Sequence, residues 1–220
     1  MLKAIIFDMD GVIIDSEYLD YQLQSRLLLE IASPSIHLVE KDFQSLVGLS
    51  GQHLLESIKK LTRTTLTLPE IQEKLDEIAG IKYAPRQIRK LFRPKLRSLL
   101  DWAKQKGLLL AVASSSNRAH IEEVLEACQI RDYFSVLVTG QDFETSKPHP
   151  AIYQAALAQL KLRPDQAIAI EDSPVGITSA KEAGLTVIGY EEPRLHLDQS
   201  QADVLLADWS AILSYLKSHS

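Results

Sequence analysis

Short runs of apolar residues recur along the chain, and each ends abruptly in a polar or glycine-bearing segment. The runs are continuous rather than alternating, which is typical of strands that are buried on both faces of a parallel sheet. This pattern predicts strands at residues 4–7, 108–113, 136–138, 167–170 and 185–188.

Segments with helical periodicity lie between these strands. Residues 95–106 follow Pro94 and end before Gly107, an arrangement that favours a helix. Similar signals predict helices at residues 118–127, 151–160 and 175–183. Because strands and helices alternate from residue 94 onward, we expect an α/β fold built on a doubly wound parallel sheet.

The segment from Asp15 to Phe92 has a different pattern, with no run that resembles a buried strand. Its periodicity predicts helices at residues 16–31, 52–61 and 69–78. We therefore expect a core domain made of residues 1–14 and 93–220, with residues 15–92 inserted as an α-helical cap domain.

Composition and charge narrow the class of protein. The 220 residues are 45% hydrophobic and 24% charged with a net charge of −5, which is ordinary for a globular protein and argues against a nucleic-acid binder. The single cysteine, Cys128, excludes an intramolecular disulfide and a cysteine-based zinc site. The longest apolar stretch, residues 108–113, is too short to span a bilayer, and Asp8 comes too early for a signal peptide. We expect a cytoplasmic protein that binds no membrane.

One basic segment leaves a nucleic-acid role open. Residues 79–100 contain seven basic side chains and no acid. Arg86, Arg89, Arg93 and Arg97 would share one stripe of a continuous helix. A solvated helix face is the simpler interpretation, because charge runs alone discriminate poorly between a binding surface and an ordinary one.

Polar side chains follow three of the predicted strands. Asp8 and Asp10 come directly after the first strand, Ser114 after the second, and Glu171 and Asp172 after the fourth. Ligands of open α/β sheets bind outside the carboxyl ends of the strands, so these side chains should meet in one crevice. The segment before a later helix, residues 146–150, could bring Lys147 to the same place.

Such a crevice needs a cation. Asp8, Asp10, Glu171 and Asp172 would otherwise repel one another, and clustered carboxylates without histidine or cysteine favour Mg²⁺. A metal beside a lysine and a hydroxyl group would suit a phosphoryl group. Each acid taken singly could instead cap a turn or a helix.

These residues resemble the haloacid dehalogenase superfamily. Residues 7–17, FDMDGVIIDSE, are similar to its first motif, Ser114 to the second, Lys147 to the third, and Glu171 with Asp172 to the fourth. The motifs are in the expected order, and the helical insert after the first is similar to the α-helical C1 cap of one subgroup. The resemblance covers the whole chain and implies a Rossmann-like core.

The resemblance implies a covalent mechanism. Asp8 would attack phosphorus to form an aspartyl-phosphate, and Asp10 would protonate the leaving oxygen and then deprotonate water. Asp8, Asp172 and the backbone carbonyl of Asp10 would hold Mg²⁺, with Glu171 as a ligand or a neighbour of the ligands.

The remaining motif residues would bind the phosphoryl group. Ser114 would donate a hydrogen bond to it, and Lys147 would neutralise its charge while orienting Asp8. Backbone N–H groups near Met9 and Ser115 would complete the phosphate site. The cap would close over the site and exclude water.

Two departures from the family pattern argue against a β-phosphoglucomutase-like mutase. Asp20 stands where those mutases have a cap histidine, and residues 47–51 lack their phosphate-binding arginine. A dehalogenase is disfavoured because it would lack Asp10. We therefore expect a monomeric, Mg²⁺-dependent phosphatase that acts on a small phosphorylated metabolite, such as a sugar phosphate. A sugar-phosphate mutase and a catalytically degenerate binding scaffold are the alternatives.

Overall fold

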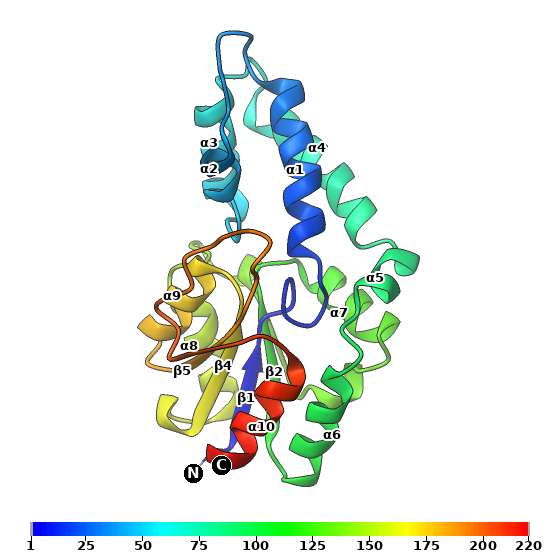
Figure 1. The fold of residues 1–220 in the computed structure, drawn as a ribbon, viewed down its shortest axis with the longest axis vertical. Coiled ribbons are helices and arrows are strands. Elements are labelled where there is room, and N and C mark those ends of the chain that lie inside the picture. The colour runs from blue at the N-terminus through cyan, green and yellow to red at the C-terminus, as the bar shows by residue number, and fades with distance from the viewer. Residues whose placement is uncertain (1, 220) are drawn as a thin grey trace.

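The computed structural model describes residues 2–219, in which one parallel sheet carries helices on both faces and a layer of helices above one edge (Figure 1). The strands are β1 (Ala4–Phe7), β2 (Leu109–Ser114), β3 (Val136–Thr139), β4 (Ala167–Glu171), β5 (Thr186–Tyr190) and β6 (Val204–Leu206). Their order across the sheet is β3-β2-β1-β4-β5-β6, with every pairing parallel. The predicted α/β fold is confirmed.

The helices follow the strands as expected for a doubly wound sheet. In the core they are α6 (Leu96–Gln105), α7 (Arg118–Ala127), α8 (Ala151–Leu160), α9 (Pro174–Glu182) and α10 (Trp209–His219). The inserted segment forms α1 (Glu17–Ile31), α2 (Glu40–Gln44), α3 (Gly51–Thr62), α4 (Leu68–Lys82) and α5 (Pro85–Leu91). Three short 3₁₀ turns are η1 (Arg131–Tyr133), η2 (Gly140–Asp142) and η3 (Pro164–Gln166). Within residues 2–219, no helix is both long and apolar enough to cross a membrane.

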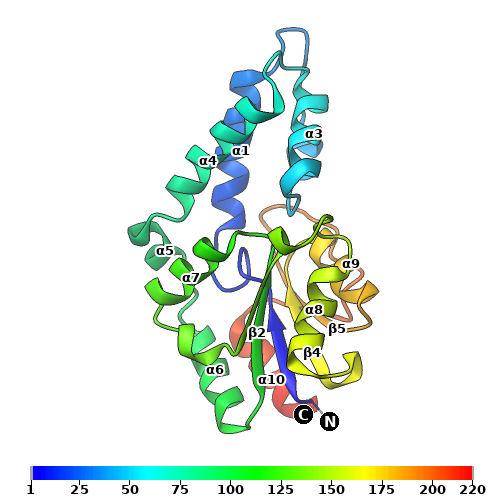
Figure 2. The same ribbon diagram turned by 180° about the vertical axis from the view of Figure 1, so that it is seen from behind.

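Successive residues of β1 point to opposite faces of the sheet, and both faces are buried. Ile5 and Phe7 belong to the apolar cluster that includes α6, α7 and α10, whereas Ala4 and Ile6 belong to the cluster with α8 and α9. Helix α10 lies in front of the sheet in Figure 1, and α8 lies in front of it in the reverse view of Figure 2. This two-sided burial explains the unbroken apolar runs of the sequence.

The helical layer has an apolar cluster of its own. Helices α1 to α4 pack around Leu28, Leu46, Ile58 and Ile71 above the carboxyl ends of the strands (Figure 1). Helix α5 differs, because its Ile88 belongs to the sheet-side cluster with α7. The domain limits at residues 15 and 92 therefore stay a prediction.

The two connections between the core and the helical layer run side by side. Ile14 and Phe92 form an antiparallel bridge, and the Asp15 N–H donates to the Leu91 carbonyl at 2.7 Å. Arg93 adds an ion pair with Asp15 at 3.0 Å. Both crossings of the chain are thus held at one place.

The expected single stripe of arginines is wrong. Helix α5 ends at Leu91 and α6 begins at Leu96, because Pro94 disfavours helical backbone at the residue before it. Arg93 turns inward to Asp15 and to the ring of Tyr190. Arg93 therefore does not share an exposed stripe with Arg86, Arg89 and Arg97.

Candidate active site

The carboxyl ends of β1, β2 and β4 bring the predicted site residues together. The register pairs Phe7 with Val112 and with Ile170, so the residues that follow these strands emerge at the same edge. That edge faces the helical layer (Figure 1). Because strand order reverses between β1 and β4, it is also the expected ligand position for such a sheet.

Lys147 is buried at the centre of this site. Its Nζ donates to Asp8 Oδ1 at 2.7 Å, to Glu171 Oε1 at 2.6 Å and to the Ala113 carbonyl at 3.1 Å. Burial alone would lower the pKa of Lys147, but the two carboxylates raise it above its usual value. The lysine is therefore a fixed cation that connects β1, β2 and β4.

Glu171 is fully buried, and its carboxylate accepts hydrogen bonds at both oxygens. Besides Lys147, the Tyr153 hydroxyl donates to Oε1 at 2.7 Å, and the Asp172 N–H donates to Oε2 at 3.1 Å. Gly176 lies against this carboxylate, since a Cβ there would be 2.1 Å from Oε1. The absence of a side chain at residue 176 leaves room for Glu171.

Gly176→Ala is expected to displace Glu171 and to lower the free energy of unfolding by about 1–3 kcal/mol, the usual cost of overpacking. Gly80→Ala is the matched control, because Gly80 is also helical and a Cβ there meets nothing within 4 Å. That change should raise stability by roughly 0.5–1 kcal/mol. Urea unfolding of both variants measures the difference, and equal stabilities would contradict the packing argument.

Three buried carboxylates are close enough to hold one metal ion. Asp8, Glu171 and Asp172 each offer an oxygen, and these oxygens all lie within 4.8 Å of one another. Asp172 Oδ2 is buried and makes no hydrogen bond within the described part of the chain. Burial and the carboxylates of Glu17, Glu171 and Asp8 raise the pKa of Asp172 well above its usual value. An all-oxygen set with excess negative charge fits a hard divalent cation.

Asp8 is buried, and its environment disfavours the charged form. Burial raises the pKa of Asp8 to about 7, with Lys147 opposing this shift and Glu171 adding to it. The carboxylate oxygen that Lys147 does not hold is free to react or to bind a cation. A carboxylate with few stabilising partners besides Lys147 is suited to act as a nucleophile.

The Asp10 carboxylate lies apart from this group and is hydrogen-bonded on both oxygens. Ser16 donates to Oδ1 at 2.6 Å, while Tyr83 and Ser116 donate to Oδ2 at 2.7 and 2.8 Å. Burial alone would raise the pKa of Asp10, but Lys82 and these hydroxyls lower it. Because the carboxylate is occupied by these partners, the metal ligand predicted at Asp10 fits its main-chain carbonyl oxygen and not its carboxylate.

Lys82 and Tyr83 are site residues that the sequence did not reveal. Lys82 Nζ is 3.4 Å from Asp10 Oδ1 and 3.2 Å from Asp20 Oδ2, and its pKa is raised well above the usual value because the carboxylates outweigh burial. Lys82 belongs to the basic segment noted in the sequence, but nothing there distinguishes it from its exposed neighbours.

The serines at the end of β2 complete the floor of the site. Ser114 is 1% exposed, and its Oγ accepts from the Ser116 N–H at 3.1 Å. Ser115 Oγ is 3.4 Å from Ser146 Oγ, which is in turn 2.6 Å from Ser50 Oγ of the helical layer. Met9 is fully buried, so it could serve the site only through its backbone.

The loop at residues 47–51 contacts the core. Gly48 has a φ of +79°, and a Cβ there would be 2.6 Å from Val175 Cγ2 and 2.9 Å from Ser173 Cβ. This loop lines the cavity beside the strand ends. The glycine thus allows the helical layer to approach helix α9 closely.

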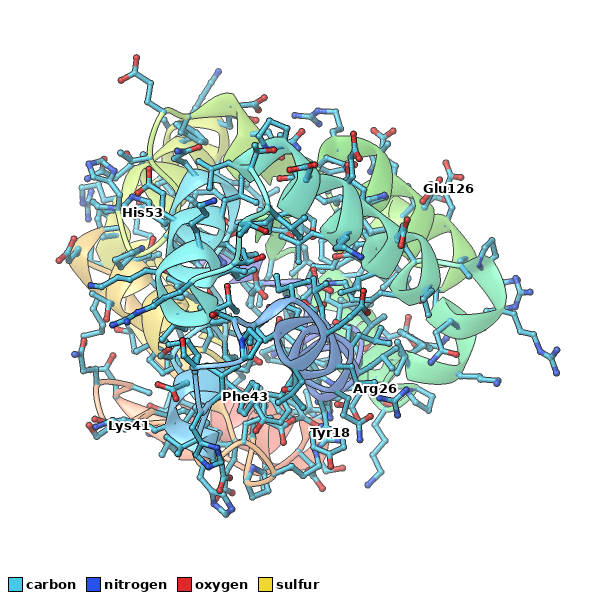
Figure 3. All side chains as sticks on the ribbon, turned by 90° about the horizontal axis from the view of Figure 1, so that it is seen from above. Tyr18, Arg26, Lys41, Phe43, His53 and Glu126 are labelled. Carbon is cyan, nitrogen blue, oxygen red and sulfur yellow. The ribbon has the colours of Figure 1, made fainter. Side chains whose placement is uncertain are left out.

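A cavity of about 240 Å³ lies between the strand ends and the helical layer. Asp8, Asp10, Ser114 and Lys147 line its floor. Figure 3 views the molecule from the side of the helical layer and places Phe43 beside α1, where its ring meets Tyr21 at 6.5 Å. By contrast, His53 and Lys41 are exposed at the periphery (Figure 3).

Comparisons with known proteins agree with this architecture. A family model described as haloacid dehalogenase-like hydrolase matches residues 5–190. A phosphorylated carbohydrates phosphatase of Thermotoga maritima is 28% identical over 186 residues, covering 84% of this chain and 82% of that protein.

Solved structures extend the similarity to the whole fold. A β-phosphoglucomutase from Clostridium difficile has a TM-score of 0.78 at 23% identity and covers 100% of this chain and 99% of its own. CbbY from Rhodobacter sphaeroides, solved with phosphate, has a TM-score of 0.74 at 27% identity, with 96% of each chain covered. The similarity therefore includes both the sheet and the helical layer.

Proposed function

The chain belongs to the haloacid dehalogenase-like hydrolase family and is a phosphatase of that family, and from this we propose that it hydrolyses a small phosphomonoester with the help of Mg²⁺. The observation that carries the proposal is the position of Asp8, which lies at the end of β1, within 2.7 Å of Lys147, on the floor of a cavity. A nucleophile, a fixed cation and a second carboxylate thus face one small space.

Asp8 and Asp10 divide the chemistry between them. Asp8 attacks phosphorus while the bond to the ester oxygen breaks, and Asp10 gives its proton to the departing alcohol. The aspartyl-phosphate is then attacked by water, whose proton passes to Asp10, so that phosphate leaves and both residues return to their starting states. The lowered pKa of Asp10 fits the second step, in which its carboxylate accepts the proton of water, and the first step requires Asp10 to be protonated when the substrate is bound.

The remaining floor residues bind the phosphoryl group. Ser114 Oγ donates to one phosphoryl oxygen, and Lys147 balances the charge while holding Asp8 in place. Backbone N–H groups of Met9 and Ser115 add further donors. Donors fixed before the reaction stabilise the developing charge without reorganisation.

The residues that would hold Mg²⁺ are Asp8, Asp172 and the main-chain carbonyl of Asp10, with Glu171 beside them. The unpaired Oδ2 of Asp172 supports this assignment. Bound there, Mg²⁺ would neutralise the carboxylates and polarise a phosphoryl oxygen. Glu171 orients Lys147 by accepting a hydrogen bond from its Nζ at 2.6 Å.

Residues 15–92 act in this proposal as a cap that closes over the site. The paired connections at Ile14 and Phe92 form a compact pivot, and the contact between Ser50 and Ser146 joins the far side of the cap to the core. Closure would exclude bulk water before Asp8 attacks.

Hydrolysis is favoured over transfer between sugar hydroxyls. Asp20, in the position of the mutase histidine, is an ion-pair partner of Lys82 rather than a proton carrier. The loop at residues 47–51 supplies glycines and serine but no arginine for a second phosphate.

Removing divalent metal is expected to lower phosphate release from sugar and polyol phosphates by roughly 10²-fold or more, because the buried carboxylates would repel the incoming phosphate. The assay compares chelator-treated protein with the same protein after added Mg²⁺, using a panel of small phosphoesters. Restoration by Mg²⁺ is the expected result. Full activity in chelator would contradict the proposed metal dependence. If no ester of the panel released phosphate even with Mg²⁺, the proposed hydrolase activity would be contradicted.

A further inference from the structure

The roof of the cavity, formed by α1, α4 and the loop before α3, determines what the alcohol part of the substrate can be. The floor supplies the groups for one phosphate, and the roof lies over the rest of the molecule. This inference rests on the proposed function and concerns the substrate class of that same site.

Within residues 2–219, Lys82 is the only lysine of the roof, and its charge is already balanced. Lys82 Nζ lies 3.4 Å from Asp10 Oδ1 and 3.2 Å from Asp20 Oδ2, so two carboxylates already balance one ammonium group. Its side chain is 10% exposed, which leaves it little room to turn toward another anion. An anionic group of the substrate would compete with two preplaced carboxylates.

No other strong cation faces the cavity from above. Among residues 2–219, no arginine lines it. His120 does, but its ring packs at a tilt against Tyr83, with the ring centroids 4.3 Å apart, and burial lowers its pKa, which keeps it neutral near pH 7. A second phosphate or a carboxylate would find no partner.

The acids of the roof add repulsion. Asp20 and Asp76 line the cavity, and Asp76 lies on the exposed side of α4. Glu17 also lines it, but burial and the nearby Asp20 raise the pKa of Glu17 well above its usual value, which favours its uncharged form. Gln72 donates to Asp76 Oδ1 at 2.7 Å and fixes it there. With one lysine against Asp20 and Asp76, the roof is net negative.

The uncharged part of the roof suits a hydroxylated compound. Gln24, Gln72, Ser25 and Tyr21 offer hydrogen-bonding groups between apolar side chains such as Leu75. The cavity of about 240 Å³ is at the small end for ligand sites. We infer that the substrate is a small monophosphate whose alcohol part is hydroxyl-bearing and uncharged or cationic, and that the negative roof excludes esters with a second anionic group.

Three esters of equal carbon number test this inference: glucosamine 6-phosphate, glucose 6-phosphate and 6-phosphogluconate, which differ in having a cationic, neutral or anionic tail. With Mg²⁺ and at about 0.15 M salt, kcat/KM should be lowest for 6-phosphogluconate, by about tenfold against glucose 6-phosphate. Glucosamine 6-phosphate should equal or exceed the neutral ester.

Asp76→Asn removes one roof charge away from the floor. It should raise kcat/KM for 6-phosphogluconate relative to glucose 6-phosphate by about threefold. Glu73→Gln is the matched control, because Glu73 is exposed on the same helix and does not line the cavity. The control should leave the ratio unchanged.

The outcomes distinguish failure of the inferred substrate class from failure of the proposed phosphatase activity. Equal rates for the three esters, preference for the anionic ester, or equal effects of Asp76→Asn and Glu73→Gln would overturn the substrate class and leave the phosphatase intact. No hydrolysis of any ester would overturn the proposed function and this inference with it.

Discussion

Asp8→Asn is expected to abolish phosphate release, lowering kcat/KM by at least roughly 10³-fold for every ester that the protein hydrolyses. The amide has the size of the carboxylate but cannot form the aspartyl-phosphate. Because burial already raises the pKa of Asp8 to about 7, a neutral side chain is tolerated at this position. The variant should therefore fold with a thermal midpoint close to that of the wild type, which makes the loss chemical rather than structural.

Asp132→Asn is the matched control for this change. Asp132 lies in the exposed turn η1, outside the lining of the cavity, and the same substitution there should leave activity at the wild-type level. Steady-state phosphate release and thermal unfolding are measured for both variants. Residual activity of Asp8→Asn within tenfold of the wild type would rule out Asp8 as the nucleophile.

Lys147→Met is expected to lower both activity and stability. The change leaves the buried carboxylates of Asp8 and Glu171 without their common cation, and loss of one partner from a buried ion pair typically costs about 3–5 kcal/mol. Phosphate release should fall by roughly 10²-fold or more, because charge stabilisation at the phosphoryl group is lost as well.

Urea unfolding and phosphate release are the measurements, with Lys217→Met as the control. Lys217 is exposed on α10, so the same substitution there should change neither quantity beyond error. A Lys147→Met protein with wild-type stability would show that the ion pairs with Asp8 and Glu171 do not hold the site together.

Much of the fold could be predicted from the sequence because the sheet is covered on both faces. Continuous apolar runs identified β1 to β5, and the limits of β1, Ala4 and Phe7, were predicted correctly. The strand β6, Val204–Leu206, was missed because it is short and half-exposed at the edge of the sheet.

The floor of the site could also be predicted, for a related reason. Asp8 and Asp172 follow directly after strands, Ser114 and Glu171 are the last residues of strands, and parallel strands place such residues at one edge. The roof could not be predicted in the same way. Lys82 and its neighbour Tyr83 reach Asp10 only because α4 ends above β1, a long-range packing that helical periodicity does not encode.

The most direct test of the central claim is to trap phosphate on the protein. Wild-type protein with Mg²⁺ is mixed with a radiolabelled sugar phosphate under single-turnover conditions, quenched in acid over a series of times, and digested. The account predicts transient label on the peptide that contains Asp8, and none on the Asp8→Asn protein. Release of phosphate with no labelled protein at any time, or label on another residue, would contradict it.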